Sequence, residues 1–131
     1  MNKSLATLAA AGVAAASLLA FAPTASAAGC VTSGITTGWE GPGTVAYKAA
    51  SPCNDLNLTY AYSASSTYPI PYAGYYKNSS GAWVQGSAGW IRVKNGAYAV
   101  DQIVLVSDLT PGTPFSVGTF LQGGEWVVVT H

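Results

Sequence analysis

Apolar side chains recur at about every second position through most of the chain after residue 28, and Gly, Pro, Asn and Ser interrupt them at short intervals. Alternation of apolar and polar residues is typical of β-strands that bury one face. The clearest case is residues 55–63, whose large alternating side chains are Leu56, Leu58, Tyr60 and Tyr62. No segment after residue 28 repeats with the period of a helix. The pattern therefore predicts an all-β domain.

Turn-forming residues divide the same region into short strands. We expect further strands at residues 31–35, 44–49, 72–77, 82–85, 90–94, 97–107, 113–121 and 125–130. Short turns at residues 78–81, 95–96 and 122–124 predict three β-hairpins. The Asn95-Gly96 pair gives the strongest signal, because both residues tolerate the positive φ of a type I′ turn.

The first 27 residues predict a secretory signal peptide. They have a short basic start at Lys3, an Ala- and Leu-rich run over residues 5–21, and a small-residue stretch at 23–27 of the form that signal peptidase cleaves. The Ala-rich run resembles export signals of high-GC Gram-positive bacteria. We expect cleavage after Ala27, no membrane span and one mature domain at residues 28–131.

A lipoprotein signal is the alternative interpretation of this region. The sequence Ala27-Ala28-Gly29-Cys30 resembles a lipoprotein box, in which Cys30 would be acylated. Such a box usually has Leu where this chain has Ala27, and the polar stretch at 23–26 separates the apolar run from the cysteine. Cleavage after Ala27 is therefore the preferred prediction.

Cys30 and Cys53 are the only two cysteines of the chain. In an exported protein an even number of cysteines indicates a disulfide. Closing a loop of this length stabilises a fold by about 3 kcal/mol. A metal site or a catalytic thiol is less favoured, because neither cysteine has a clustered second ligand or a nearby His.

Residues 109–117 read Leu-Thr-Pro-Gly-Thr-Pro-Phe-Ser-Val. This stretch resembles the corner between the fifth and sixth strands of fibronectin type III and other immunoglobulin-like sandwiches. The resemblance implies that the following residues point into the core: Val104, Val106, Leu109, Phe115 and Val117. Phe115 stands where the tyrosine corner has Tyr, so the hydroxyl bond of that corner cannot form. We expect a small immunoglobulin- or fibronectin-III-like antiparallel β-sandwich, with a small β-barrel as the alternative.

Charge and residue types limit the chemistry. The 131 residues include five basic and five acidic side chains, which give no basic surface for nucleic acid. His131 is the only His and the last residue, so we interpret it as a solvated chain end and not as part of a catalytic triad. The carboxylates have no spacing that pairs two of them in a cleft. We therefore expect no catalytic residue, no cofactor and no metal site, with calcium in a loop left open.

Aromatic residues crowd the region from residue 60 to residue 90. Aromatics with a polar group can form platforms for sugar rings or anchors of a protein interface, although they also favour strands. If Tyr72 and Tyr76 face the core, alternation turns Tyr75 to the solvent. The candidate binding residues are Tyr68, Tyr72, Tyr75, Trp83 and Trp90, of which Tyr75 and Trp83 are the best single candidates.

These observations predict a secreted recognition module that is not an enzyme. Its expected partner is an extracellular glycan, a cell-wall component or an extracellular protein. One alternative is a proteinaceous inhibitor of an extracellular hydrolase. Another is a self-assembling cell-surface protein, because the uncharged runs at 103–106 and 126–129 are prone to pair at an exposed sheet edge. The oligomeric state is not determined by the sequence.

Overall fold

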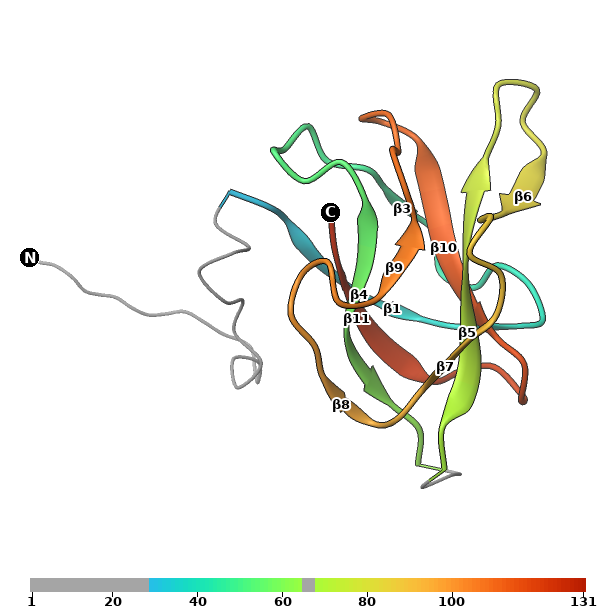
Figure 1. The fold of residues 1–131 in the computed structure, drawn as a ribbon. Helices are drawn as coiled ribbons and strands as arrows, with labels where there is room; N and C mark the ends of the chain where they lie inside the picture. Colours follow the sequence, from blue (N-terminus) through green and yellow to red (C-terminus); the bar gives the residue numbers. More distant parts are fainter. Residues whose placement is uncertain (1–28, 65–67) are drawn as a thin grey trace, which may run out of the picture.

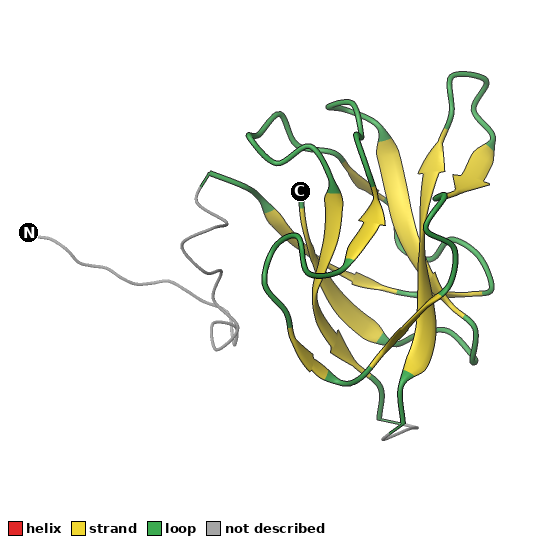
Figure 2. Ribbon diagram, in the orientation of Figure 1, coloured by secondary structure: helices red, strands yellow, loops and turns green. Residues whose placement is uncertain are grey.

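The computed structural model describes residues 29–64 and 68–131, so the expected signal peptide at residues 1–27 lies outside the described residues. Within them the chain forms eleven β-strands and no helix (Figure 2). The strands are β1 (Thr32–Thr36), β2 (Gly38–Trp39), β3 (Ala46–Tyr47), β4 (Leu56–Tyr62), β5 (Ile70–Lys77), β6 (Trp83–Gln85), β7 (Ile91–Val93), β8 (Gly96–Ala97), β9 (Val104–Val106), β10 (Pro114–Thr119) and β11 (Trp126–Thr130).

The strands form two sheets in a sandwich-like arrangement that is not closed into a barrel (Figure 1). In the first sheet β11 lies between β1 and β4, and β4 also pairs with β8 and β9. In the second sheet β10 pairs with β5; β2 and β3 border β10, while β6 and β7 border β5. All of these pairs are antiparallel except β2 with β10, which is parallel.

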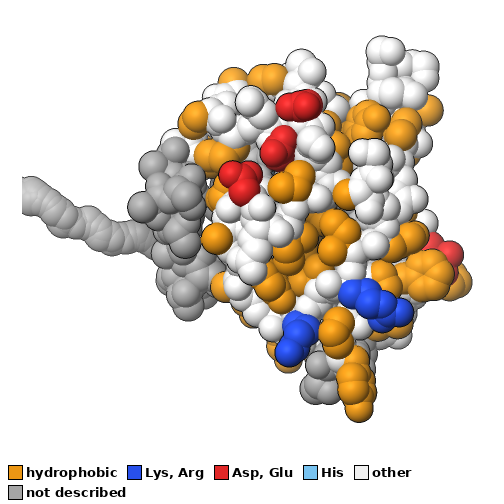
Figure 3. All heavy atoms as spheres, viewed as in Figure 1, with side chains coloured by type: hydrophobic (Ala, Val, Ile, Leu, Met, Phe, Trp, Pro, Cys, Tyr) orange, Lys and Arg blue, Asp and Glu red, His pale blue; other side chains and the backbone are white. Residues whose placement is uncertain are grey.

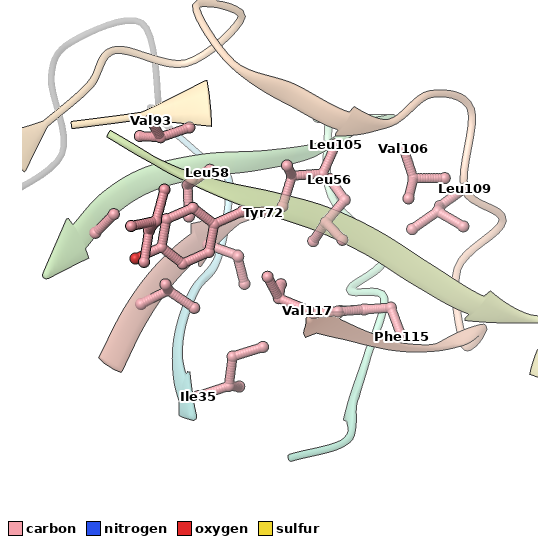
Figure 4. Packing of buried hydrophobic residues seen from close by; sticks show 14 residues of the cluster. Ile35, Leu56, Leu58, Tyr72, Val93, Leu105, Val106, Leu109, Phe115 and Val117 are labelled. Atoms are coloured by element: carbon pink, nitrogen blue, oxygen red, sulfur yellow. The ribbon is translucent and has the colours of Figure 1, made fainter. Parts of the chain in front are cut away.

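An apolar core fills the space between the sheets. Tyr72 of β5 is fully buried, and its ring lies near Leu58 and Val93 (Figure 4). Of the residues that the corner resemblance placed inside, four are buried: Val106, Leu109, Phe115 and Val117. Val104 is only half-buried, because its neighbour Leu105 takes the fully buried position in β9.

A β-bulge in β4 reverses the alternation expected for residues 55–63. Leu56 and Leu58 are fully buried, as expected. The register then shifts, because Leu58 lies opposite Val129 while Tyr60 lies opposite Val128. An extra residue on one strand moves the following side chains to the other face of the sheet. Tyr62 therefore lies on the outer face of the first sheet instead of in the core.

One of the three expected hairpins is confirmed. β5 and β6 pair across the turn at 78–81, where Asn78 Oδ1 accepts hydrogen bonds from the backbone N–H groups of Ser80 and Ala82 at 3.0 Å each. The Asn95-Gly96 hairpin is wrong, because β7 pairs with β5 and β8 with β4. The chain crosses between the sheets there, and Asn95 Oδ1 accepts from the backbone N–H of Ser63 at 2.9 Å.

The hairpin expected at 122–124 is also wrong, because β10 and β11 belong to different sheets. This loop is instead another segment that crosses from one sheet to the other. The expected strand at 97–107 is divided as well: β8 and β9 are separated by a loop in which Asp101 has a φ of 71°. The turn-forming residues thus predicted where the chain bends, but they did not predict which strand the next segment pairs with.

Cys30 and Cys53 form the expected disulfide, with their Cα atoms 5.5 Å apart. A cysteine sulfur in a disulfide is not available for acylation, so the lipoprotein interpretation of Cys30 disagrees with this structure. Among the described residues, no helical segment has the length and hydropathy needed to cross a bilayer. The run at 126–129 is not an edge strand, because β11 is paired on both sides.

Candidate functional site

Exposed apolar side chains gather around the loop that joins β10 to β11. Of the nine large hydrophobic side chains that are exposed in residues 29–64 and 68–131, five flank this loop, and each of the five is between 38% and 67% exposed. They are Trp39, Tyr62, Phe120, Leu121 and Trp126, which we call the aromatic surface. They come from β2, β4, the loop itself and β11, so tertiary folding alone brings them together.

The loop at 120–124 lies against Trp39 of β2 at Gly123 and is hydrogen-bonded through the backbone to Thr37, the residue before β2. Gly123 and Gly124 have φ values of 79° and 83°, in the region that only glycine adopts readily. A Cβ at Gly123 would lie 2.8 Å from the backbone nitrogen of Trp39, so the two segments are in close contact. Gly124 N–H donates to Thr37 O at 2.8 Å, and Thr37 N–H donates to Glu125 O at 2.9 Å.

A hollow of about 450 Å³ lies on one side of this loop. Its lining residues are Trp39, Glu40, Phe120, Leu121 and Gln122, and we call it the Trp39 hollow. Glu40 N–H donates to Thr119 O at 2.8 Å, which fixes the residue after Trp39 to the end of β10. An indole and a phenyl ring thus border the same open space as a carboxylate and an amide.

Phe120 packs against Trp90, which in turn packs against Tyr75. The Trp90 ring meets the Phe120 ring edge to face, with centroids 5.2 Å apart, and the Tyr75 ring meets Trp90 in the same way at 6.4 Å. Burial, and then the charge of Glu40, raise the pKa of Tyr75 above its usual value. Edge-to-face contacts of this kind favour one orientation of each ring. The exposed Phe120 ring therefore has a rigid base.

A second hollow, of about 300 Å³, lies on the other side of the loop. Its lining residues are Tyr62, Ala64, Gln122, Gly123, Gly124, Glu125 and Trp126, and we call it the Trp126 hollow. Tyr62 and Trp126 lie directly opposite each other on β4 and β11, so their side chains are neighbours on the outer face of the sheet. A Cβ at Gly34 of β1 would lie 2.2 Å from the indole of Trp126, so this glycine lets the indole lie against the sheet.

Glu125 lies beside the Trp126 hollow and is only 6% exposed. Its carboxylate accepts hydrogen bonds from Thr37 Oγ1 at 3.2 Å and from Ser63 Oγ at 3.4 Å. Its backbone N–H donates to Thr37 Oγ1 at 3.0 Å. These partners are neutral, and within the described residues no cationic group hydrogen-bonds to this carboxylate. The Trp126 hollow is therefore lined by Glu125, whose buried carboxylate has only neutral hydrogen-bond partners in the part of the chain that the structure describes.

Tyr72 lies close enough to Glu125 for the carboxylate to affect it. Its hydroxyl is buried and has no hydrogen-bond partner among the described residues. Burial, followed by the charges of Glu125 and Tyr98, raises the pKa of Tyr72 well above its usual value. Tyr72 is therefore a core residue with no exposed surface, although the sequence analysis named it as a candidate binding residue.

The other predicted binding residues do not form one surface. Tyr75 points outward as alternation required, but it is only 8% exposed, because Trp90 and the loop after β2 cover it. Trp90 is half-buried and acts as the support of Phe120. Trp83 is half-buried on β6, where the Lys77 ammonium lies 5.4 Å from its ring centroid. Tyr68 is 79% exposed in the loop between β4 and β5.

His131 is not the solvated chain end that we expected. It is 1% exposed, and its ring meets Phe115 edge to face with centroids 4.8 Å apart. Hydrogen bonds of 2.8 Å in both directions between His131 and Val31 extend the pairing of β11 with β1 beyond the strand ends. Burial, and then the charge of Lys48, lower the pKa of His131 to about 4. The ring is therefore neutral at pH 7.

Ser33 Oγ and His131 Nε2 are 3.0 Å apart, a distance at which a nucleophile and its base would meet. However, His131 Nδ1 accepts a hydrogen bond from the backbone N–H of Ala49 at 2.9 Å. The neutral ring must then carry its proton on Nε2 and donate to Ser33. A base for serine needs the opposite tautomer, with Nε2 unprotonated. We conclude that this pair is a structural contact between β1, Ala49 and residue 131.

Acidic residues gather elsewhere, near the disulfide. Asp55, Asp101 and Asp108 border one depression, and Figure 3 shows acidic side chains grouped on this face of the molecule. Asp55 Oδ1 accepts from the backbone N–H of Asp108 at 2.9 Å. In residues 29–64 and 68–131, no group of three or more His, Cys, Asp or Glu side chains is placed to hold a metal ion.

None of the five residues of the aromatic surface was among the binding residues predicted from the sequence, although some of them carried a signal. Trp39 comes just before the Gly41-Pro42-Gly43 turn, and Phe120 and Leu121 come just before the Gly123-Gly124 pair. Large apolar residues beside glycine-rich turns lie where strand pairing cannot bury them. Tyr62 carried no comparable signal, because its exposure depends on the bulge in β4.

Comparisons with known protein families, with curated proteins and with solved structures gave no match for this chain.

Proposed function

We propose that this protein is a non-catalytic recognition module that binds an extracellular carbohydrate, such as a glycan or a cell-wall polysaccharide, at the aromatic surface. The observation that carries the proposal is the placement of an exposed indole in each of two hollows that share Gln122. A sugar ring has an apolar face of C–H groups and a rim of hydroxyls. An aromatic ring beside a few fixed polar groups matches both.

The polar groups of the two hollows favour a sugar over a purely apolar ligand. The Trp39 hollow has Glu40 and Gln122 at its border, and the Trp126 hollow has Gln122 and Glu125. Carboxylates accept hydrogen bonds from hydroxyls, and an amide both donates and accepts. The indole rings have few rotors to order on binding, which lowers the entropic cost of the contact.

We further infer that the protein is secreted after cleavage behind Ala27. The composition of residues 1–27 and the disulfide support this inference, because disulfides persist in oxidising compartments. We also infer an immunoglobulin-like corner at 109–117, since it joins β9 and β10 of opposite sheets. The crossing from β10 to β11 departs from that fold, in which the last two strands share a sheet.

Calorimetric titration with soluble oligosaccharides tests the proposed function. Trp39→Ala should weaken binding by about 1 to 3 kcal/mol, as expected for a central aromatic contact. Trp83→Ala is the matched control, because it removes an indole on β6, outside both hollows. Binding that Trp83→Ala abolishes and Trp39→Ala leaves unchanged would reject this surface. Failure to bind any carbohydrate, with tight binding of a secreted hydrolase, would favour the inhibitor alternative.

A further inference from the structure

The carboxylate of Glu125 gives the Trp126 hollow a feature that the Trp39 hollow lacks. Both hollows have a carboxylate at their border, but Glu40 is exposed whereas Glu125 is 6% exposed. Water screens an exposed carboxylate, so its attraction for a cation is small. A buried carboxylate is screened far less and favours a bound counter-charge much more strongly.

The neighbours of Glu125 do not supply that counter-charge. Thr37 and Ser63 donate hydroxyl hydrogen bonds of 3.2 and 3.4 Å, which are long for a bond to a carboxylate. Tyr72 Oη, buried and without a partner in the described structure, adds no positive charge. The charge of this carboxylate is therefore not compensated by these neighbours, and it would attract a cation that enters the hollow lined by Glu125.

The two aromatic rings of the hollow attract the same kind of ligand. Tyr62 and Trp126 are 49% and 44% exposed and lie side by side on the sheet. The faces of such rings carry a negative quadrupole that attracts an ammonium group placed within about 6 Å. A positive charge that enters the hollow would thus have two aromatic rings and a carboxylate among the lining residues.

We propose that the Trp126 hollow binds a protonated amino group carried on a sugar ring, so that the preferred ligand is an amino-sugar polymer with free amines. This inference rests on the proposed carbohydrate-binding function. The amine would lie toward Glu125, while the sugar ring lies on Tyr62 or Trp126. An N-acetylated sugar has no charge to offer and would lose the contact with Glu125.

Three hexasaccharides of the same β-1,4 backbone test this directly on the unmodified protein. They carry an ammonium, an acetamide or a hydroxyl group at position 2 of each ring. The ammonium hexamer should bind about tenfold more tightly than either neutral hexamer, which corresponds to about 1.4 kcal/mol. Equal affinity for all three hexamers would overturn the amino-sugar preference and leave the carbohydrate-binding proposal standing.

Variants then identify the residue on which the preference for the ammonium hexamer depends. Glu125→Gln keeps the shape and the hydroxyl partners of the side chain and removes its charge, so the affinity ratio between the ammonium and hydroxyl hexamers should fall toward one. Asp101→Asn removes a charge near the disulfide, outside both hollows, and should leave the ratio unchanged. A ratio lost in Glu40→Gln and kept in Glu125→Gln would overturn the assignment to this hollow.

A linear polyamine of equal charge separates recognition of an amino sugar from adsorption of any polycation. It should compete at least about tenfold more weakly than the ammonium hexamer, because it has no ring face to stack on aromatic side chains. Equal competition would overturn the proposal. Circular dichroism of Glu125→Gln checks its fold, and if that variant is unfolded the hexasaccharide comparison on the unmodified protein still decides the question.

Discussion

Protonation of His131 should destabilise the fold in mild acid. The ring is packed against Phe115, its Nδ1 accepts a hydrogen bond from Ala49, and its pKa is lowered to about 4, first by burial and then by Lys48. In the unfolded chain the pKa of His is about 6.5. Because the folded pKa is the lower one, the unfolded state takes up the proton first as the pH falls.

The sign and the size of the effect follow from this difference in pKa. The contribution of His131 to stability is fully present above about pH 6.5 and is lost progressively as the pH falls to about 4. A difference of about 2.5 pKa units corresponds to an upper limit of about 3 kcal/mol. Ser33 beside the ring is half-buried, so solvent screens part of the charge and we expect a loss of about 2 kcal/mol.

Urea unfolding between pH 7.5 and pH 4, compared between the protein and His131→Asn, measures this loss. Asn keeps an oxygen near the position of Nδ1 and does not titrate, so the carboxylates cancel in the difference between the two curves. Because the chain has a single His, its Hε1 resonance also gives the folded pKa directly. A midpoint near 6.5, or parallel stability curves for the two proteins, would refute the buried neutral ring.

Three further predictions follow from individual contacts. Gly34→Ala places a Cβ where the Trp126 indole lies. The variant should lose about 1 to 3 kcal/mol of stability in thermal unfolding and bind oligosaccharides more weakly. A variant with the stability and binding of the parent protein would contradict this contact. Tyr72→Phe removes a buried hydroxyl that has no hydrogen-bond partner in the described residues. It should leave the free energy of unfolding unchanged or raise it by up to about 1 kcal/mol. A loss above about 2 kcal/mol would mean that this hydroxyl is hydrogen-bonded. Cys30→Ser should lower stability by about 3 kcal/mol, and intact mass of the secreted protein should fit a chain starting at Ala28 that lacks two hydrogens; free thiols would contradict the disulfide.

The sequence predicted the class of the fold because alternation depends only on local chemistry. The inward positions of Leu56, Leu58, Phe115 and Val117 follow from the two-residue period of a strand and are buried in the structure. Strand pairing was harder to predict, because the same turn residues can close a hairpin or redirect the chain to the other sheet. The crossing after β7 is stabilised by hydrogen bonds between Asn95 and Ser63, which are 32 residues apart.

The residues of the candidate site were also hard to predict from the sequence, because their exposure depends on tertiary packing. Aromatic crowding in residues 60–90 drew attention to Tyr72 and Tyr75, yet tertiary packing covers both of them. Tyr62 is exposed only because of the bulge in β4, and Trp39 lines the same hollow as Phe120 only because β2 joins the second sheet beside β10. His131 is buried, and not solvated as expected, because it is hydrogen-bonded to Val31 and Ala49. No local sequence pattern predicts these contacts.

The indole N–H resonances of the four Trp residues test the central claim most directly, because each indole reports on its own surroundings. Titration of the isotopically labelled protein with the ammonium hexamer should shift the signals of Trp39 and Trp126, which border the two hollows. The signal of Trp83, on β6 outside both hollows, should stay in place. Shifts of Trp83 with no change at Trp39 or Trp126 would contradict a carbohydrate site at the aromatic surface.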